Sequence, residues 1–432
     1  MTDLRRRMLR ILYVSQYFPP EVCAPAVRVY EFSREWVKLG HEVTVLTGFA
    51  HHPTGIKAPA DRWRVFRRET KDSISVVRTY VWAAPNRGTV RRMISYASFL
   101  ASAVTLGRFG VSRPDIVVAT SPQLLCALAG YFIARSMRRP FVFEVRDLWP
   151  ESVLAVGAMR ENIIVRGMRR VARMLYRRSD AIVTVGEGYR LKIHELYGIP
   201  LDKMDVVYNG ADTAFFTPGP RDNEIRREWG WGDRFVALYL GTHGMAHGLE
   251  TVLGAAEKLR DRKDILFVFV GEGAEKERLK TMAAAKRLEN VQFVDQQPRE
   301  RVRLFYAACD MGIVTLRKAE LFSTVIPSKL FEHFSMERPV LISVDGEARR
   351  LVEEAGAGEF VPQENAGALA DAVVRWSADR KRLAEMGRKG RVFVIERFDR
   401  RALAERYIRI LQSVACGRPQ AASRDDVQRE PR

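Results

Sequence analysis

Short apolar runs alternate with longer helical segments along most of the chain, and this alternation limits the fold more than any other feature of the sequence. Apolar runs at 11–15, 115–119 and 141–144 have the length of buried strands, and helical patterns cover 27–39 and 124–137. A helix between two strands carries the chain back across a sheet, so the strands pair in parallel. The pattern predicts a doubly wound parallel sheet covered by helices.

The same pattern starts again after residue 205. A stretch rich in Gly, Pro and Thr at 210–220 is typical of a linker, and apolar runs at 235–240 and 265–271 follow it. A chain of 432 residues is long enough for two such domains, each with its own core. We therefore expect an α/β protein of two doubly wound domains facing a cleft. The predicted parts are a first domain over 1–205, a second over 206–390, a closing helix over 391–415 and a disordered tail over 416–432.

The basic charge of the chain is concentrated in its first half. The formal net charge is +19, and residues 1–205 hold 33 Lys and Arg against 18 Asp and Glu, leaving only +4 for the rest. Such a surface suits an anionic membrane or a nucleic acid, although solvated basic faces would give the same count. No zinc finger, RNA-recognition signature or aromatic–basic ladder is present, so a nucleic acid is not expected as a partner.

The sequence predicts a protein that lies on a membrane without crossing it. No apolar run reaches the roughly 18 residues that span a bilayer. The longest, 94–106, follows Arg91 and Arg92 and is either a core helix or an interfacial helix with one face in lipid. Four widely spaced cysteines without a CxxC pattern favour a reducing compartment, and residues 1–10 lead into no signal-peptide core. We expect a cytoplasmic protein, peripherally bound to the inner face of the membrane.

The loop at 17–29 joins the first predicted strand to the first helix. Loops at the carboxyl ends of strands form the binding crevice of doubly wound sheets. Pro19, Pro20 and Pro25 stiffen this loop, and the N-terminus of the following helix suits an anion. The other interpretation is a rigid turn without a ligand.

Two segments of the second half suit a phosphate group. Gly271 and Gly273 allow close backbone approach to a ligand, although glycine is common at strand-to-helix turns. Lys329 follows the helix-start residue Ser328, where a cation is unfavourable beside the helix dipole unless an anion joins it. Glu332 lies on the same helix face and can accept both hydroxyls of a ribose. A diphosphate cradle and an ordinary Lys–Glu surface helix are both compatible with this segment.

Six motifs in order resemble the retaining glycosyltransferases of family 4, which have the GT-B fold, over residues 9–414. The motifs are YFPPE (17–21), DLWPES (147–152), YNGAD (208–212), LGTHGMAHGL (240–249), GEGAEKERL (271–279) and IPSKLFEHFSMERPVL (326–341). The first, second and last are similar to a bacterial surface-polysaccharide subgroup that includes L-fucosamine (N-acetylfucosamine) transferases of O-antigen synthesis. The resemblance implies a nucleotide-sugar donor in the C-terminal domain, an often lipid-linked acceptor in the N-terminal domain, and a C-terminal helix that packs back toward the N-terminal domain.

Carried over by position, Glu332 matches the second glutamate of the family's E-x7-E motif, which binds the donor ribose. Thr324 stands where the first glutamate would touch the donor sugar, and backbone amides between Val325 and Ser328 are the expected substitute.

The family's Gly-Arg…Lys-Gly phosphate motif is also altered in this chain. It reads Gly241-Thr242 and then His247-Gly248, so both cations are missing. Lys329, together with His243 or His247, is the expected replacement on the donor phosphates.

On the acceptor side, the family's His-Asp pair reads Arg146-Asp147, and the Gly-Gly of the first loop is replaced by Cys23-Ala24-Pro25. The residues expected to line the acceptor site are Glu21, Pro25, Arg146, Asp147 and Glu151. Asp147 either assists removal of the acceptor proton or caps a helix.

These residues predict retaining transfer of a sugar from a nucleotide, with UDP as the expected carrier, to a lipid-linked or saccharide acceptor in surface polysaccharide synthesis. An N-acetylated amino or deoxy sugar is one option for the group transferred. Asp147, Lys329 and Glu332 are the predicted catalytic residues. The main task expected of the enzyme is to stabilise the negative charge that develops on the leaving phosphate. No metal or other cofactor is expected, because the cleft loops lack a clustered Asp-x-Asp. Two other classes of protein stay open. One is a nucleotide-sugar epimerase. The other is a non-catalytic membrane-associated assembly protein, and Thr242 and Thr324 favour this second class.

Overall fold

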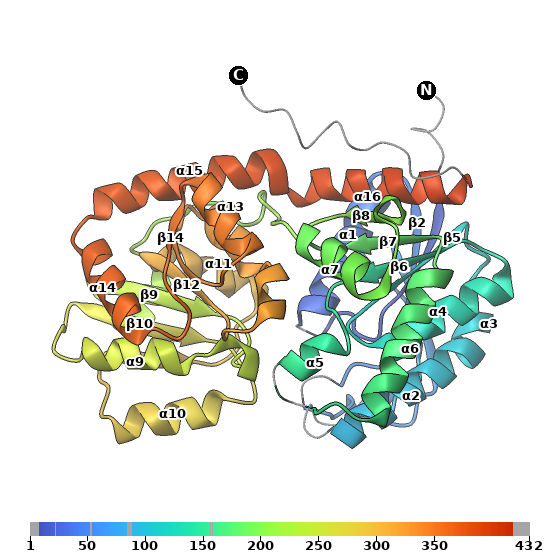
Figure 1. The fold of residues 1–432 in the computed structure, drawn as a ribbon, viewed down its shortest axis with the longest axis horizontal. Helices are drawn as coiled ribbons and strands as arrows, with labels where there is room; N and C mark the ends of the chain where they lie inside the picture. The colour runs from blue at the N-terminus through green and yellow to red at the C-terminus, as the bar shows by residue number, and fades with distance from the viewer. Residues whose placement is uncertain are drawn as a thin grey trace. The chain divides into compact units, whose positions relative to one another are not determined.

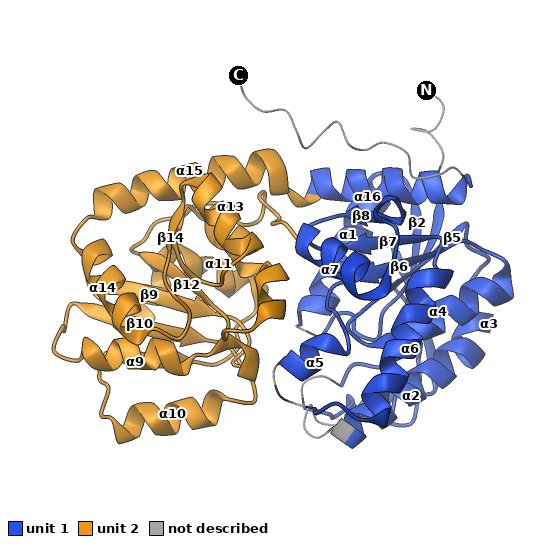
Figure 2. Ribbon diagram, viewed as in Figure 1, with its two compact units in different colours: residues 1–208, 401–432 blue, residues 209–400 orange. Residues whose placement is uncertain are grey.

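The computed structural model describes residues 8–21, 23–51, 54–83, 89–155, 157 and 159–417. Two compact units divide the chain, unit 1 with residues 1–208 and 401–432 and unit 2 with residues 209–400 (Figure 2). Residues 418–432 of the predicted disordered tail lie outside the described residues.

Unit 1 is built on an eight-stranded sheet in the order β3-β4-β2-β1-β5-β6-β7-β8, parallel except for the antiparallel pair β3 and β4. Figure 1 labels β2, β5, β6, β7 and β8 of this sheet. Its strands are β1 (Arg10–Val14), β2 (Glu42–Gly48), β3 (Phe66–Lys71), β4 (Ile74–Thr79), β5 (Ile116–Thr120), β6 (Phe141–Val145), β7 (Ala181–Thr184) and β8 (Met204–Val206). Its helices are α1 (Ala24–Lys38), α2 (Thr89–Ser102), α3 (Arg108–Gly110), α4 (Leu124–Met137), α5 (Glu151–Ala155), α6 (Ile163–Arg178), α7 (Glu187–Tyr197) and, beginning at the unit boundary, α16 (Arg400–Ala415).

Unit 2 has a six-stranded, wholly parallel sheet in the order β11-β10-β9-β12-β13-β14. Its strands are β9 (Phe235–Leu240), β10 (Ile265–Val270), β11 (Val291–Val294), β12 (Met311–Thr315), β13 (Val340–Ser343) and β14 (Gly358–Phe360). Its α-helices are α8 (Glu224–Glu228), α9 (Glu250–Lys258), α10 (Lys276–Ala285), α11 (Arg299–Ala308), α12 (Lys329–Ser335), α13 (Glu347–Ala355), α14 (Ala366–Ser377) and α15 (Arg380–Phe398).

The strand order reverses between β1 and β5 in unit 1 and between β9 and β12 in unit 2. Doubly wound sheets bind ligands outside the carboxyl ends of the strands at such a reversal. The two predicted doubly wound sheets are therefore confirmed, and each has one edge where a ligand is expected.

Both faces of the unit 2 sheet are buried, as expected for parallel strands under helices. Along β9, Phe235, Ala237 and Tyr239 enter one core, and Val236 and Leu238 enter the core on the other face. The unbroken apolar runs of the sequence follow from this arrangement, because each residue of the strand faces apolar side chains on one side or the other.

Helix α16, the last helix that the structure describes, packs on unit 1, as the resemblance implied. In α16, the ring of Tyr407 meets Trp36 edge-on at 5.2 Å, and Trp36 Nε1 donates to the carbonyl of Ala404 at 3.2 Å. The segment 391–415, predicted as one helix, is instead the end of α15 and the whole of α16. The backbone leaves the helical region between them, at Asp399 (φ −61°, ψ 129°).

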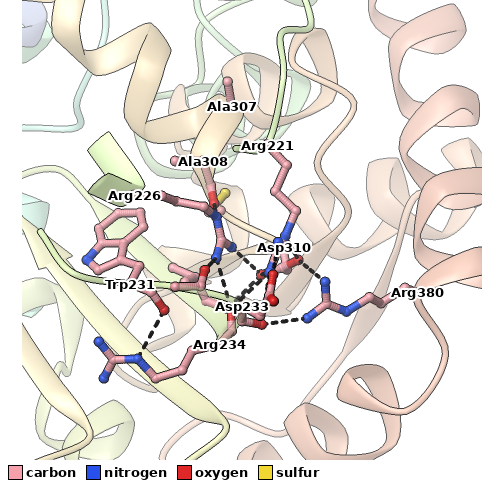
Figure 3. A network of polar contacts seen from close by, with 12 residues as sticks. Arg221, Arg226, Trp231, Asp233, Arg234, Ala307, Ala308, Asp310 and Arg380 are labelled. Atoms are coloured by element: carbon pink, nitrogen blue, oxygen red, sulfur yellow. Dashed lines mark hydrogen bonds and ion pairs between the residues drawn. The ribbon is translucent and has the colours of Figure 1, made fainter. Parts of the chain in front are cut away.

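A charged network fixes the start of unit 2 at the amino-terminal edge of its sheet (Figure 3). Asp310 directly precedes β12 and accepts from Arg221 Nε at 2.6 Å, Arg226 Nη2 at 2.8 Å and the backbone N–H of Val236 at 2.8 Å. This edge is opposite to the carboxyl ends of the strands. The network therefore anchors the segment after the predicted linker and leaves the ligand edge free.

The apolar segment 94–106 divides between α2 and a π-helical turn at Ala103–Gly107. Phe99 and Ala103 are fully buried, whereas Ile94 and Leu106 are exposed. In the part of the chain that the structure describes, no helix combines the length and the apolar character needed to cross a membrane.

Candidate functional site

Lys329 points at the ligand edge of unit 2, where the strand order reverses. Its Nζ lies 3.8 Å from the centroid of the Tyr239 ring, at the end of β9. A Cβ added to Gly241 would lie 2.8 Å from the same atom, so Nζ lies close to the backbone of the loop after β9. Nζ is closed off from solvent and has no hydrogen-bond partner in the part of the chain that the structure describes. A buried ammonium without an acceptor is costly, which marks this atom as a group that waits for an anion.

Two histidines border the same ring. His243 and His247 lie 5.8 and 5.9 Å from Tyr239, centroid to centroid, and His247 belongs to a 3₁₀ turn at Met245–His247. Burial, with repulsion from Lys329, lowers the pKa of each imidazole to about 3. Burial also lowers the pKa of Lys329 to about 7, although Glu332 opposes the shift. Near neutral pH both histidines are uncharged, and the proton of this cluster is carried by Lys329.

Glu332 is held by a tyrosine that the sequence did not indicate. Tyr306 of α11 donates its hydroxyl to Oε2 of Glu332 at 2.6 Å. The other oxygen, Oε1, has no partner among the described residues. Burial raises the pKa of Glu332, while the bond from Tyr306 works against that shift. The carboxylate is thus fixed by one oxygen and can accept a ligand hydroxyl with the other.

The glycines of the two loops are explained by contact between the loops. Gly241 and Gly271 have φ of +144° and +141°, and a Cβ at Gly271 would lie 2.0 Å from the carbonyl oxygen of Gly241. A Cβ at Gly273 would lie 2.3 Å from the carbonyl oxygen of His243. The close approach predicted for Gly271 and Gly273 is therefore made by the neighbouring backbone, which positions His243.

The other predicted donor residues lie around the start of α12. The Thr324 hydroxyl donates to the Leu321 carbonyl at 2.7 Å within a 3₁₀ turn at Glu320–Thr324. The N–H of Val325 already donates to Phe322 at 3.1 Å, so the expected compensation by this amide is not available. Ser328 precedes the helix without a side-chain capping bond.

The remaining donor features add little to the charge at this edge. Thr242 is exposed, and its carbonyl accepts from the Tyr239 hydroxyl at 2.7 Å. Helix α12 has only seven residues. Its dipole is correspondingly small, so positive charge at this edge rests on Lys329 and not on the helix end.

Arg146 and Asp147 follow β6 at the ligand edge of unit 1. Their backbone N–H groups donate to the hydroxyl oxygen of Ser121, which follows β5, at 2.8 and 3.3 Å. Oδ2 of Asp147 accepts from the Ser152 hydroxyl at 3.0 Å, and burial raises the pKa of this carboxyl to about 6. Asp147 is therefore poised to exchange a proton near neutral pH.

The other predicted acceptor residues hold the loops together. Glu21 accepts from the backbone N–H of His51 at 3.0 Å and of Phe18 at 3.3 Å. Glu151 accepts from Arg169 Nε at 3.0 Å and from the Tyr197 hydroxyl at 2.9 Å, which joins α5 to α6 and α7. Pro25 lies in the first turn of α1, a position that suits proline.

A buried carboxylate beside Arg146 was missed in the sequence. Oε1 of Glu144 accepts from Tyr13 at 2.7 Å and from Thr120 at 2.8 Å, and Oε2 pairs with Arg28 at 3.1 Å. Burial opposes its ionisation, but the arginines outweigh it and lower the pKa of Glu144. An acidic residue in the middle of the apolar strand FVFEV was the available signal, because a buried carboxylate needs partners. Within the described ranges, no group of three or more His, Cys, Asp or Glu side chains is arranged to hold a metal ion.

Two known protein families match consecutive parts of the chain. Residues 25–215 match the family described as Glycosyltransferase Family 4. Residues 221–393 match the family described as Glycosyl transferases group 1. The two ranges contain most of unit 1 and most of unit 2.

Curated relatives and solved structures agree with these matches. WbjE of Pseudomonas aeruginosa, named a glycosyltransferase, is 23% identical over 60% of this chain and 65% of its own length, just under two thirds. WcaI of Escherichia coli K12, named a colanic acid biosynthesis glycosyl transferase, is 25% identical over 74% of this chain and 80% of its own length. The structure of Anabaena HepE in complex with UDP and glucose has a TM-score of 0.72 at 17% identity, and the match covers 94% of this chain and 100% of HepE. A likeness at that identity concerns the fold alone.

Proposed function

The chain carries a Glycosyltransferase Family 4 domain and a Glycosyl transferases group 1 domain on the GT-B fold, and from these we propose that it transfers a sugar from a UDP-sugar with retention of configuration. The unpartnered, buried ammonium of Lys329 is the observation that carries the proposal. UDP is chosen as the carrier because the fold neighbour HepE was solved with UDP and glucose.

In this proposal Lys329 meets the leaving diphosphate. Negative charge grows on that group as the sugar bond breaks, and the protonated Lys329, held at a fixed place and shielded from water, stabilises it strongly. Glu332, held by Tyr306 at 2.6 Å, accepts the ribose hydroxyls through its unpartnered oxygen. Neutral His243 and His247 can donate N–H to phosphate oxygens without adding charge.

Unit 1 takes the acceptor in this proposal. Asp147 accepts the proton of the attacking hydroxyl, since burial raises the pKa of its carboxyl to about 6. The name of WcaI, a colanic acid biosynthesis enzyme, favours a saccharide or lipid-linked acceptor in surface polysaccharide synthesis. An N-acetylated amino or deoxy sugar, as in the L-fucosamine subgroup, remains the option to test first, and no metal ion is proposed in the reaction.

The same unit is proposed to rest on the cytoplasmic face of an anionic membrane. Trp63 and Phe109 are 85% and 83% exposed, with the guanidinium groups of Arg62 and Arg108 at 5.4 and 5.8 Å from their rings. Exposed aromatic rings beside arginines suit the boundary between anionic headgroups and acyl chains. Flotation with anionic vesicles should retain the protein and release it at high salt, and equal binding to zwitterionic vesicles would contradict this part of the proposal.

A panel of UDP-sugars with membrane-lipid acceptors, read by mass spectrometry, tests the proposed reaction. The anomeric configuration of the product, read by NMR, tests retention. Glu332→Ala should raise the donor KM strongly, whereas Glu300→Ala, an exposed glutamate on α11, should leave it unchanged. Conversion of a UDP-sugar without an acceptor would show an epimerase. Absence of UDP-induced thermal stabilisation would favour a non-catalytic assembly protein.

A further inference from the structure

Two nitrogens of the Arg146 guanidinium have no partner among the residues that the structure describes. Its Nε and Nη1 atoms are closed off from solvent and make no hydrogen bond. No ion pair joins the side chain to any residue that the structure describes. Arginine normally satisfies its planar set of N–H groups with carboxylate or phosphate oxygens, in pairs.

The groups around Arg146 leave its charge uncompensated. Glu144 is the acidic residue with the largest effect on the pKa of Arg146, but that carboxylate is already paired with Arg28 at 3.1 Å. Burial raises the pKa of the neighbouring Cys23 thiol to about 12, so it is uncharged at neutral pH. Asp147 directs Oδ2 to Ser152, and burial disfavours its ionised form. Two arginines therefore share one firmly ionised carboxylate, Glu144.

The backbone that carries Arg146 is fixed at the place where a ligand is expected. Its N–H donates to the hydroxyl oxygen of Ser121, which follows β5 at the reversal of strand order, and Arg146 itself follows the neighbouring strand β6. Asp147, the proposed acceptor of the substrate proton, is the next residue. A ligand group on Arg146 would thus lie beside the attacking hydroxyl of the acceptor.

We infer that Arg146 binds an oxyanion of the acceptor, so that the acceptor is an anionic saccharide and not a neutral one. The inference rests on the proposed function only in assigning unit 1 to the acceptor. A phosphate of a lipid-linked diphosphate and the carboxylate of an acidic sugar present the same chemistry, oxygens that can accept from the unsatisfied N–H groups of the guanidinium. Leaving Nε and Nη1 unsatisfied and closed off from solvent is unfavourable in the empty protein, and an anion that accepts from them removes that penalty.

The test is calorimetric titration of the full chain, first saturated with UDP so that the donor site is filled. Inorganic pyrophosphate and D-glucuronate are the two anionic probes, and glucose is the neutral control. Wild type should bind one of the anions in the millimolar range, and Arg146→Met should weaken that binding about tenfold or more. Arg146→Lys, which offers a point charge without the paired N–H groups, should fall between them. Arg170→Met, at an exposed position on α6, is the matched control and should bind as wild type does.

Thermal unfolding without ligand separates a binding role from a structural one. If Arg146 is uncompensated, Arg146→Met should raise the melting temperature by a few degrees, because removing an unpaired buried charge stabilises the fold. A lower melting temperature for this variant would overturn the inference, since it would show a structural partner for the guanidinium.

Each outcome of the titration has a defined meaning. Binding of pyrophosphate points to a phosphate-linked acceptor, and binding of glucuronate points to an acidic sugar. Equal binding by wild type and Arg146→Met, or no saturable binding of either anion, overturns the inference. A failure of UDP to bind would count against the proposed function instead, and the anion titration without UDP would still test Arg146.

Discussion

Binding of the donor should take up a proton at Lys329. Burial lowers the pKa of this side chain to about 7, and the diphosphate needs the charged form. At pH 8 only about a tenth of the empty sites carry the proton, so binding should take up about 0.9 proton; the uptake should be about 0.5 at pH 7 and about 0.1 at pH 6. Above pH 7 the apparent affinity should fall by up to about tenfold per pH unit.

Calorimetry with UDP-glucose in HEPES and in Tris at one pH measures this uptake directly. The observed heat depends on the ionisation enthalpy of the buffer in proportion to the number of protons bound. UDP-glucose is the suitable probe because its diphosphate stays ionised over this range. His243, His247 and His333, each with a pKa lowered by burial to about 3, do not contribute.

Lys329→Arg is the matched control for the proton uptake. Arginine keeps its charge through the whole range, so this variant should bind UDP-glucose with no uptake between pH 7 and 9. Any uptake that persists in Lys329→Arg would belong to another group, such as Glu332. Identical heats in the two buffers for wild type would refute the assignment of Lys329 as the cation that meets the diphosphate.

Three further predictions follow from buried contacts. Tyr306→Phe removes the hydrogen bond that fixes Glu332, and such a bond to a charged acceptor is worth about 1.5–3 kcal/mol. This variant should therefore bind UDP about tenfold more weakly in calorimetry. An unchanged affinity for UDP would contradict the role of Tyr306. Gly271→Ala should lower the free energy of unfolding by about 3 kcal/mol or more in denaturant unfolding, because its Cβ meets the carbonyl of Gly241. Gly230→Ala, with open space around the added Cβ, should lower it by only about 1 kcal/mol. Similar losses for the two variants would refute the steric argument. Glu144→Gln should lower the free energy of unfolding by about 3 kcal/mol at pH 7. The pKa of Glu144 is lowered in the folded protein, so the ionised carboxylate stabilises the fold above the unfolded pKa of 4.5. This stabilisation is lost as pH falls through the folded pKa. The difference in unfolding free energy between wild type and Glu144→Gln should therefore shrink in acid, and a constant difference would contradict the prediction.

The strands and helices were predictable where burial alone decides them. The predicted bounds of 124–137 coincide with α4, whose buried residues include Leu124, Ile133 and Met137. Strand β3, with the sequence FRRETK, was missed because its residues are half-buried or exposed and it pairs with β4 at the edge of the sheet. Such a strand exists through its hydrogen bonds and carries no apolar pattern.

The candidate site was predictable in part. Lys329 was singled out because a lysine in the first turn of a helix breaks a local rule, and the structure places it under the loop after β9. Tyr306 could not be found in this way, since it lies 26 residues before Glu332 on another helix. Gly271 shows the opposite case, because a glycine that contacts backbone and one that contacts a ligand look the same in a sequence.

The packing of α16 on unit 1 determines the order in which the two units can complete their folding during synthesis. Unit 2 is a continuous piece of chain, residues 209–400, and can form its core as soon as it has left the ribosome. Unit 1 is synthesised first, but Trp36 and Phe32 stay uncovered until Tyr407 arrives from the last helix. The fold of unit 1 is therefore completed last, although its first 208 residues are synthesised first. A fragment ending at residue 208 should expose this aromatic surface unless residues 400–417 are supplied as a separate peptide.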